Sequence, residues 1–351
     1  MGNAARKEEK MKAAIVNPYL DTLGGGERYT MGVARALVGK GYKVDVEWKD
    51  PSIKEKLEKR FHIDLEGVDF IEDVDRGDGY DVCFWVSDGS IPILRARKNF
   101  LHFQVPFHDG SGKTLLNKMK FFRIEKNICN SYFTKKVIDK EYGVKSIVIY
   151  PPVDVGDFKP KRKENLIVSI GRFSQLKQAK RQDVLIKAFK RLYDSGFDDW
   201  EFVLAGGTEV GVDDYVKKLR KLAKGYPIRI LESPSFSQIK ELYGKAKIFW
   251  SAAGFEIDES KEPEKVEHFG IVTVEAMASG AVPIVLSAGG HKEIIADGEN
   301  GFLWENTRQL LKSTRNVVEG KGIFIKISKK AKEDSRIYEY ERFEKEIQNI
   351  L

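Results

Sequence analysis

The chain has 351 residues, more than one domain usually holds, and this length predicts two domains. Hydrophobic residues make up 42% of it, enough for packed cores, and no stretch reaches the roughly 20 apolar residues of a membrane span. The net charge of +7 favours anionic partners such as nucleotides or acidic lipid surfaces. Cys83 and Cys129 lie in apolar runs, and we expect reduced core residues rather than disulfides or a zinc site.

The first ten residues are polar and charged, which predicts a loose tail without the apolar core of a signal peptide. The cytoplasm is the expected compartment. The apolar run 13–18 predicts a first buried strand, and Gly24-Gly25-Gly26 precede a helix that opens with Glu27-Arg28. Such a turn leaves backbone N–H groups free for an anion at the helix start. A plain tight turn is an equally good explanation, because the glycines do not follow G-x-G-x-x-G.

The rest of the first half predicts further strands over 42–48, 81–87 and 99–107. Open α/β sheets bind ligands at the carboxyl ends of their strands, which makes Asp88, His102 and Gln104 candidates for a site. A histidine on a strand is more often structural than functional, so both interpretations of His102 stay open.

Three prolines between 151 and 160 break regular structure and predict a crossing between domains near 152–164. A strand over 166–170 follows, and then Gly171-Arg172 and a basic loop lead into an amphipathic helix. Fixed cations stabilise the charge that develops on a leaving diphosphate, and Arg172, Lys177 and Lys180 are of the right type. A solvated basic loop is the alternative for Lys177.

The segment 265–283 carries two acidic residues around one apolar helix. A helix that begins near Gly270 places Glu275 in its second turn and Glu267 in the loop above its N-terminus. A buried carboxylate without a partner costs several kcal/mol, so Glu275 requires one. Phosphates on the free N–H groups and hydroxyls on the two carboxylates would suit a nucleotide sugar. Compensation of the helix dipole, or pairing with Arg or Lys, is the alternative.

Three segments in this order, GGGER, GRF with a following lysine, and EHFGIVTVEAMASGAVPIV, resemble the retaining GT-B glycosyltransferases of glycosyltransferase family 4. The resemblance implies an α/β fold of two Rossmann-like, doubly wound domains that face a cleft, with a C-terminal helix crossing back to the first. We accordingly expect a tail over 1–11, an acceptor-side domain over 12–155, a nucleotide-sugar domain over 156–330 and the crossing helix over 331–351.

The resemblance also implies roles for residues. The catalytic set is Glu267, Arg172, Lys180 and His102, although Gln104-Val105-Pro106 stands where relatives often have His-x-Pro. The donor-binding set is Gly25, Gly26, Gly171, Lys177, Phe236, Phe269, Gly270, Ile271, Val272 and Glu275. The acceptor-side set is Gly24, Asp88 and Gln104.

The implied reaction transfers a hexose of mannose or glucose type from a GDP- or UDP-linked sugar with retention of configuration. The implied acceptor is a glycan, a lipid-linked glycan or a small molecule, and neither a metal nor another cofactor is expected. Peripheral contact with the inner face of a membrane is compatible with this reaction, and no nucleic-acid partner is expected. A GT-B epimerase or hydrolase of nucleotide sugars, and a non-catalytic membrane-surface module, remain as alternatives.

Overall fold

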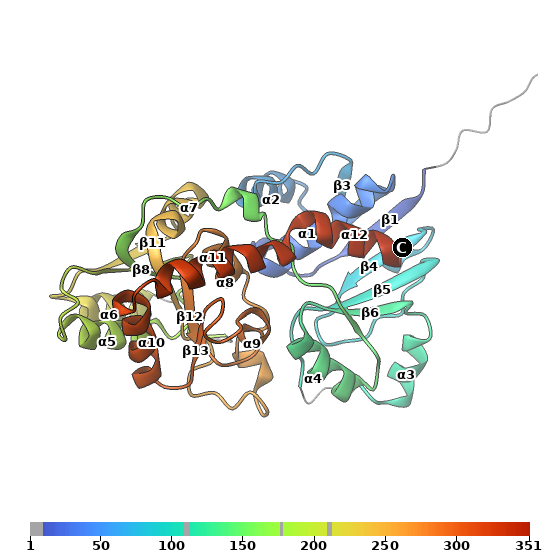
Figure 1. Ribbon diagram of the computed structural model, residues 1–351. Coiled ribbons are helices and arrows are strands. Elements are labelled where there is room, and N and C mark those ends of the chain that lie inside the picture. The colour runs from blue at the N-terminus through green and yellow to red at the C-terminus, as the bar shows by residue number, and fades with distance from the viewer. Residues whose placement is uncertain (1–9, 109–111, 176–177, 209–212) are drawn as a thin grey trace, which may run out of the picture.

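The computed structural model describes residues 10–108, 112–175, 178–208 and 213–351. This part of the chain forms two α/β domains, each built on one parallel sheet flanked by helices (Figure 1). The predicted alternation of strands and helices is confirmed, and both cysteines are buried and free, as expected. No helix in these ranges is long and apolar enough to cross a membrane.

The first domain holds a seven-stranded sheet in the order β3-β2-β1-β4-β5-β6-β7. Its strands are β1 (Lys12–Val16), β2 (Lys43–Glu47), β3 (Val68–Ile71), β4 (Val82–Val86), β5 (Lys98–Phe103), β6 (Lys126–Cys129) and β7 (Ile147–Val148). Most of their side chains are buried, as is typical of a parallel sheet with both faces covered. The helices around it are α1 (Gly25–Gly39), α2 (Ile53–Phe61), α3 (Leu115–Phe121) and α4 (Tyr132–Tyr142).

The second domain holds a six-stranded sheet in the order β10-β9-β8-β11-β12-β13. Its strands are β8 (Glu164–Ile170), β9 (Glu201–Gly206), β10 (Ile228–Glu232), β11 (Ala246–Ser251), β12 (Val282–Leu286) and β13 (Phe302–Trp304). Its helices are α5 (Gln182–Tyr193), α6 (Asp213–Ala223), α7 (Phe236–Lys245), α8 (Ile271–Ala278), α9 (His291–Ile294), α10 (Thr307–Glu319) and α11 (Ile323–Ser335). The chain passes from the first sheet to the second between β7 and β8.

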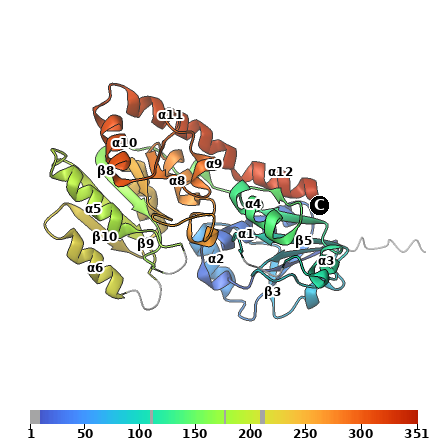
Figure 2. The ribbon, with the colours of Figure 1, turned by 90° about the horizontal axis from the view of Figure 1, so that it is seen from below.

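The last helix, α12 (Tyr340–Ile350), returns to the first domain and packs against α1, as Figures 1 and 2 show. Its inner side chains, Phe343 and Ile347, are buried in the first domain's core. Phe343 meets the ring of Tyr29 on α1 edge-on, with 5.0 Å between ring centroids. Such aromatic contacts add to the apolar area removed from water. The predicted crossing of the C-terminal helix is thereby confirmed.

Two helix starts face each other where the domains meet. α1 follows the loop after β1, and α8 follows the long loop after β11. A Cβ atom added to Gly25 at the start of α1 would lie 2.9 Å from Cδ1 of Ile271 at the start of α8. Because free N–H groups point outward from both helix starts, this junction favours negative charge.

Candidate active site

The start of α8 has the geometry that the sequence predicts. Gly270, at φ 117°, precedes the first helical residue, Ile271, and this left-handed conformation is one that glycine adopts without strain. Ile271 and Val272 are half-buried at the junction of the domains. The side chain of Phe269 points away into the core against Tyr150, at 5.5 Å between centroids. Phe269 therefore can offer a ligand its backbone, whereas its ring supports the fold.

Glu267 and Lys180 form a buried ion pair above this helix start. Lys180 Nζ lies 2.7 Å from Glu267 Oε2, and only small fractions of the two side chains are exposed. Burial alone would raise the pKa of the Glu267 carboxyl, but the Lys180 ammonium, together with His291 and His268, outweighs it and holds this pKa at about 2. The stem of Lys180 packs over Gly171, where an added Cβ would come within 3.0 Å of it. Gly171, Lys180 and Glu267 are thus brought together.

Glu275, inside α8, receives its required partner from the other domain. Arg28 Nη1 donates to Glu275 Oε1 at 3.0 Å, while Arg28 Nη2 bonds to Asp154 Oδ2 at 2.7 Å. The Tyr243 hydroxyl donates to the other oxygen, Oε2, at 3.3 Å. Burial raises the pKa of Glu275, and Arg28 and Tyr243 act against that rise. Both oxygens of Glu275 are therefore occupied by protein groups that a ligand hydroxyl could replace.

The glycine loop permits close approach to the end of β5. A Cβ atom at Gly26 would lie 1.9 Å from the side-chain oxygen of Gln104, so any larger residue here would displace the Gln104 side chain. Within the described residues, this buried Gln104 Oε1 has no hydrogen-bond donor. Gly24, at the start of α1, donates its N–H to the Glu27 carboxylate at 2.7 Å, so Glu27 stabilises the loop. Gly24, Gly25, Gly26 and Gln104 therefore lie together at the domain junction.

His102 does not lie at this junction, and its position does not support the predicted catalytic role. The side chain is fully buried, stacked 4.1 Å from the Tyr29 ring and 5.6 Å from Phe84. This burial lowers its pKa to about 3, so the ring is neutral at physiological pH. His102 lies on β5 with its side chain beneath α1, where it fills the core and presents no edge to a substrate. The structural interpretation is the one its position supports.

The remaining predicted residues fall in three places. Arg172 is exposed directly after β8, at the start of the loop that carries Lys180. Phe236 opens α7 and stacks on His62 of the first domain at 4.7 Å. Asp88 is exposed after β4, where its carboxylate accepts hydrogen bonds from the backbone N–H and the hydroxyl of Ser90. Lys177 lies outside the described residues.

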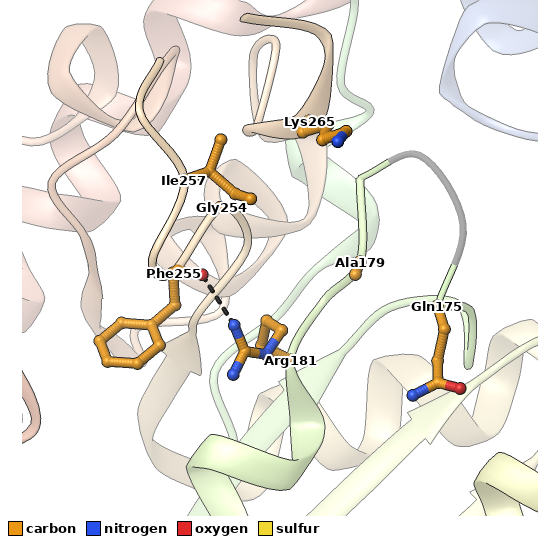
Figure 3. Close-up of a pocket in the computed structure, with 7 residues that line it drawn as sticks. All are labelled: Gln175, Ala179, Arg181, Gly254, Phe255, Ile257 and Lys265. Carbon is orange, nitrogen blue, oxygen red and sulfur yellow. Dashed lines mark hydrogen bonds between the residues drawn. The ribbon is translucent and has the colours of Figure 1, made fainter. Parts of the chain in front are cut away.

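A cavity of about 400 Å³ opens in the second domain beside the Lys180 loop (Figure 3). Arg181 reaches across it and donates from Nη1 to the Phe255 carbonyl oxygen at 2.8 Å. The cavity is lined by Gln175, Ala179, Arg181, Gly254, Phe255, Ile257 and Lys265. None of the predicted site residues that the structure describes lines this cavity, so the candidate site is the domain junction.

The structure adds residues that sequence reasoning did not place in the site. Arg28 and Tyr243 donate hydrogen bonds to Glu275. Arg28 could have been found from the sequence, because it is a charged residue in the first turn of the largely apolar α1. His291 is fully buried beside Gly270, with Nδ1 3.1 Å from the Leu286 carbonyl oxygen. That contact leaves Nε2 as an acceptor, and it has no partner among the described residues. Burial lowers the pKa of His291 to about 4, so its ring is neutral at pH 7.

In the ranges that the structure describes, no group of three His, Cys, Asp or Glu is arranged to hold a metal ion. The site consists instead of cations, carboxylates and two helix starts. Such a set can bind an anion and a polyol together.

Comparison with curated proteins identifies relatives that match this chain over different shares of its length. An enzyme of Dictyostelium discoideum, named GDP-Man:Man(3)GlcNAc(2)-PP-Dol alpha-1,2-mannosyltransferase, is 26% identical over 212 residues, 56% of this chain. The match spans only 40% of that relative's length. An alpha-1,3/1,6-mannosyltransferase of Candida glabrata is 23% identical over 371 aligned positions, covering 82% of this chain and 78% of the relative.

Comparison with solved structures gives the fold. Anabaena HepE in complex with UDP superposes with a TM-score of 0.77 at 17% identity, covering 97% of this chain and 99% of that one. Sucrose-phosphate synthase of Thermosynechococcus elongatus gives 0.72 at 14% identity, covering 97% and 98%. These neighbours confirm the predicted GT-B fold. The family described as glycosyl transferases group 1 matches residues 154–336, just over half of the chain, and the protein therefore belongs to this family.

Proposed function

We propose that the protein transfers a hexose from a nucleoside diphosphate sugar to a glycan or lipid-linked acceptor. The observation that carries the proposal is the buried Lys180–Glu267 pair beside Glu275 at the start of α8, facing the start of α1. This arrangement offers cations and N–H groups for a diphosphate, and carboxylates for hydroxyls, within one junction.

The donor would enter by exchanging partners with the protein. Its diphosphate would take the N–H groups at Ile271 and Val272 together with the cations of Lys180 and Arg172. Glu267, released from part of its contact with Lys180, would accept hydrogen bonds from the sugar hydroxyls. Each exchange replaces one charge-assisted hydrogen bond by another, so the buried charges keep partners throughout.

Glu275 would bind the ribose hydroxyls in the same way. Arg28 holds its carboxylate from the first domain, so ribose binding would replace a contact between the domains. Donor binding would therefore be coupled to the relative position of the two domains, and closure over the donor would exclude water from the reacting sugar.

We propose GDP-mannose as the first donor to test and UDP-glucose as the second. Support for mannose comes from the names of the two relatives described above, both of which are called mannosyltransferases and one of which is named for GDP-Man. Support for a uridine nucleotide comes from the fold neighbour crystallised with UDP-glucose. Three earlier predictions also belong to this proposal. The transfer would retain the configuration of the sugar, it would need no metal, and the protein would act at the inner face of a membrane.

The acceptor would approach over the first domain. The Gln104 side-chain oxygen, which has no donor in the described part of the chain, lies beside Gly26 at the junction. A buried acceptor of this kind costs free energy until a hydroxyl or N–H donates to it. A hydroxyl of the sugar that receives the hexose would donate this hydrogen bond to Gln104.

Binding tests the donor directly. We expect GDP-mannose or UDP-glucose to raise the melting temperature in the presence of EDTA, because a ligand that binds only the folded state stabilises it. Transfer is then measured with a panel of glycan and lipid-linked acceptors, and the anomeric configuration of the product is read by NMR. Absence of binding for all GDP and UDP compounds would refute the proposal, and sugar release at equal rate without acceptor would identify a hydrolase.

Variants test the roles of the site. Lys180→Met and Glu275→Gln should each lower turnover by roughly 10²- to 10³-fold, as expected for loss of one preorganised charge contact. Lys187→Met, which removes an exposed lysine from α5, is the matched control and should retain full turnover. Turnover near that of the unmodified protein in Lys180→Met or Glu275→Gln would contradict the assignment.

A further inference from the structure

The short helix α3 (Leu115–Phe121) and its C-terminal neighbour Phe122 carry an apolar face outward. Leu115, Met119 and Phe122 follow the i, i+4, i+7 spacing of one helix face, and they are 76%, 60% and 89% exposed. Leu116 beside them is 61% exposed. Helices of globular proteins normally turn such a face to the core, so this orientation is reversed. We call these four residues the α3 patch.

The inner side of α3 is held firmly against the first domain. Phe121 meets the ring of Tyr142 edge-on, with 6.3 Å between centroids. Lys120 Nζ donates to the Ile91 carbonyl oxygen at 2.8 Å, and Arg123 Nε donates to the Leu94 carbonyl oxygen at 3.2 Å. These contacts fix the rotation of the helix, so the outward position of the α3 patch is built into the fold.

Basic residues flank the α3 patch in the sequence. The segment 113–126 contains five basic residues and a single acidic one, Glu125. Lys113, Lys118 and Lys126 are exposed, whereas Lys120 and Arg123 make the inward hydrogen bonds described above. An apolar stripe flanked by lysines matches a bilayer surface, where apolar side chains enter the acyl boundary and ammonium groups meet lipid phosphates. Lysine is depleted in protein–protein interfaces, so the charge pattern favours lipid over a protein partner.

The position of α3 leaves the donor junction accessible. Figures 1 and 2 both show α3 at the outer end of the first domain, away from the second domain and from α8. Among the large hydrophobic residues that the structure describes as exposed, Phe122 is the most exposed, and four of the eleven belong to the α3 patch. A bilayer docked there would not cover the junction between the domains.

We propose that the α3 patch docks the protein on the surface of a bilayer that contains anionic lipids. The apolar side chains would insert at the boundary between headgroups and acyl chains, and the exposed Lys113 and Lys118 would bind the lipid phosphates. This docking rests on the membrane part of the proposed function and names the surface that would serve it; its test uses neither donor nor acceptor, so it can fail while hexose transfer stands. It fits a protein with a net charge of +7.

Vesicle flotation of the full chain tests the proposal. Vesicles of phosphatidylcholine mixed with phosphatidylglycerol should carry the protein, and vesicles of phosphatidylcholine alone should carry much less. The double variant Leu115→Ser/Phe122→Ser should bind at least about tenfold more weakly, because two large apolar side chains no longer leave water. Lys113→Gln/Lys118→Gln should weaken binding roughly fivefold per charge, and added salt should have the same effect.

Ile325→Ser supplies the matched control, since Ile325 is 71% exposed on α11 in the other domain. It should bind vesicles like the unmodified protein. All these variants alter exposed side chains, and unchanged melting temperatures would show that they fold. Equal binding of Leu115→Ser/Phe122→Ser and the unmodified protein, or no binding to anionic vesicles, would overturn the proposal. So would a dimer in light scattering that Phe122→Ser dissociates, because the patch would then bind a second copy.

Discussion

Lys180→Met should destabilise the second domain in a way that depends on pH. The Glu267 carboxyl has a pKa of about 2 in the folded protein, against an ordinary value of 4.5. Because this pKa is depressed, the pair contributes stability above pH 4.5 and loses it as the pH falls towards 2. The difference corresponds to about 3 kcal/mol, and removal of one partner from a buried ion pair typically costs about 3–5 kcal/mol.

In Lys180→Met the pKa of the Glu267 carboxyl shifts in the opposite direction. Without the ammonium, burial raises the pKa of this carboxyl above its ordinary value, so the variant is most unstable at neutral pH and its deficit shrinks as Glu267 takes up a proton. Urea unfolding is followed by tryptophan fluorescence, to which Trp200, Trp250 and Trp304 in the core of the second domain contribute. We expect a deficit of about 3–5 kcal/mol at pH 7 and a smaller one at pH 4.

Two controls separate charge pairing from packing. Lys187→Met should change the unfolding free energy by less than about 0.5 kcal/mol, as surface substitutions do. Glu267→Gln added to Lys180→Met should recover most of the loss, because the orphaned charge is gone. A loss in Lys180→Met as small as that in Lys187→Met, or a deficit of equal size at pH 4 and pH 7, would show that the Lys180–Glu267 pair does not stabilise the fold.

Three further predictions concern the same region. Gly289→Ala should cost several kcal/mol more than Gly298→Ala in thermal unfolding, since both have positive φ but only at Gly289 would a Cβ lie 2.0 Å from a backbone oxygen; equal losses would contradict this. Glu293→Gln should speed amide exchange at the first two residues of α4, because their N–H groups donate hydrogen bonds to the Glu293 carboxylate at 2.8 and 2.5 Å. Unchanged exchange would show that this carboxylate does not cap α4. Arg28→Met should raise the pKa of Glu275, measured by NMR titration, because Arg28 opposes the effect of burial; an unchanged pKa would show that the contact is absent in solution.

Local chemistry predicted much of the fold. Apolar runs bounded by glycine and proline indicated most strands, because a buried parallel strand must be apolar along its length. Gly270 followed by an apolar run predicted where α8 starts, and the cost of a lone buried carboxylate predicted that Glu275 has a partner. The strand β3 was not predicted, since its short, partly exposed sequence carries a weak periodic signal.

The pattern of residue types alone determined that the chain holds two α/β domains and a helix start with one acid before it and one within it. Tertiary structure alone decided which groups meet. Arg28 and Glu275 are 247 residues apart, and no periodicity can specify such a pair. His102 shows the same limit in reverse: its type suggested chemistry, whereas the packing of α1 over β5 buries it. Periodicity reports which face of an element is buried, but partners depend on how the elements pack in three dimensions.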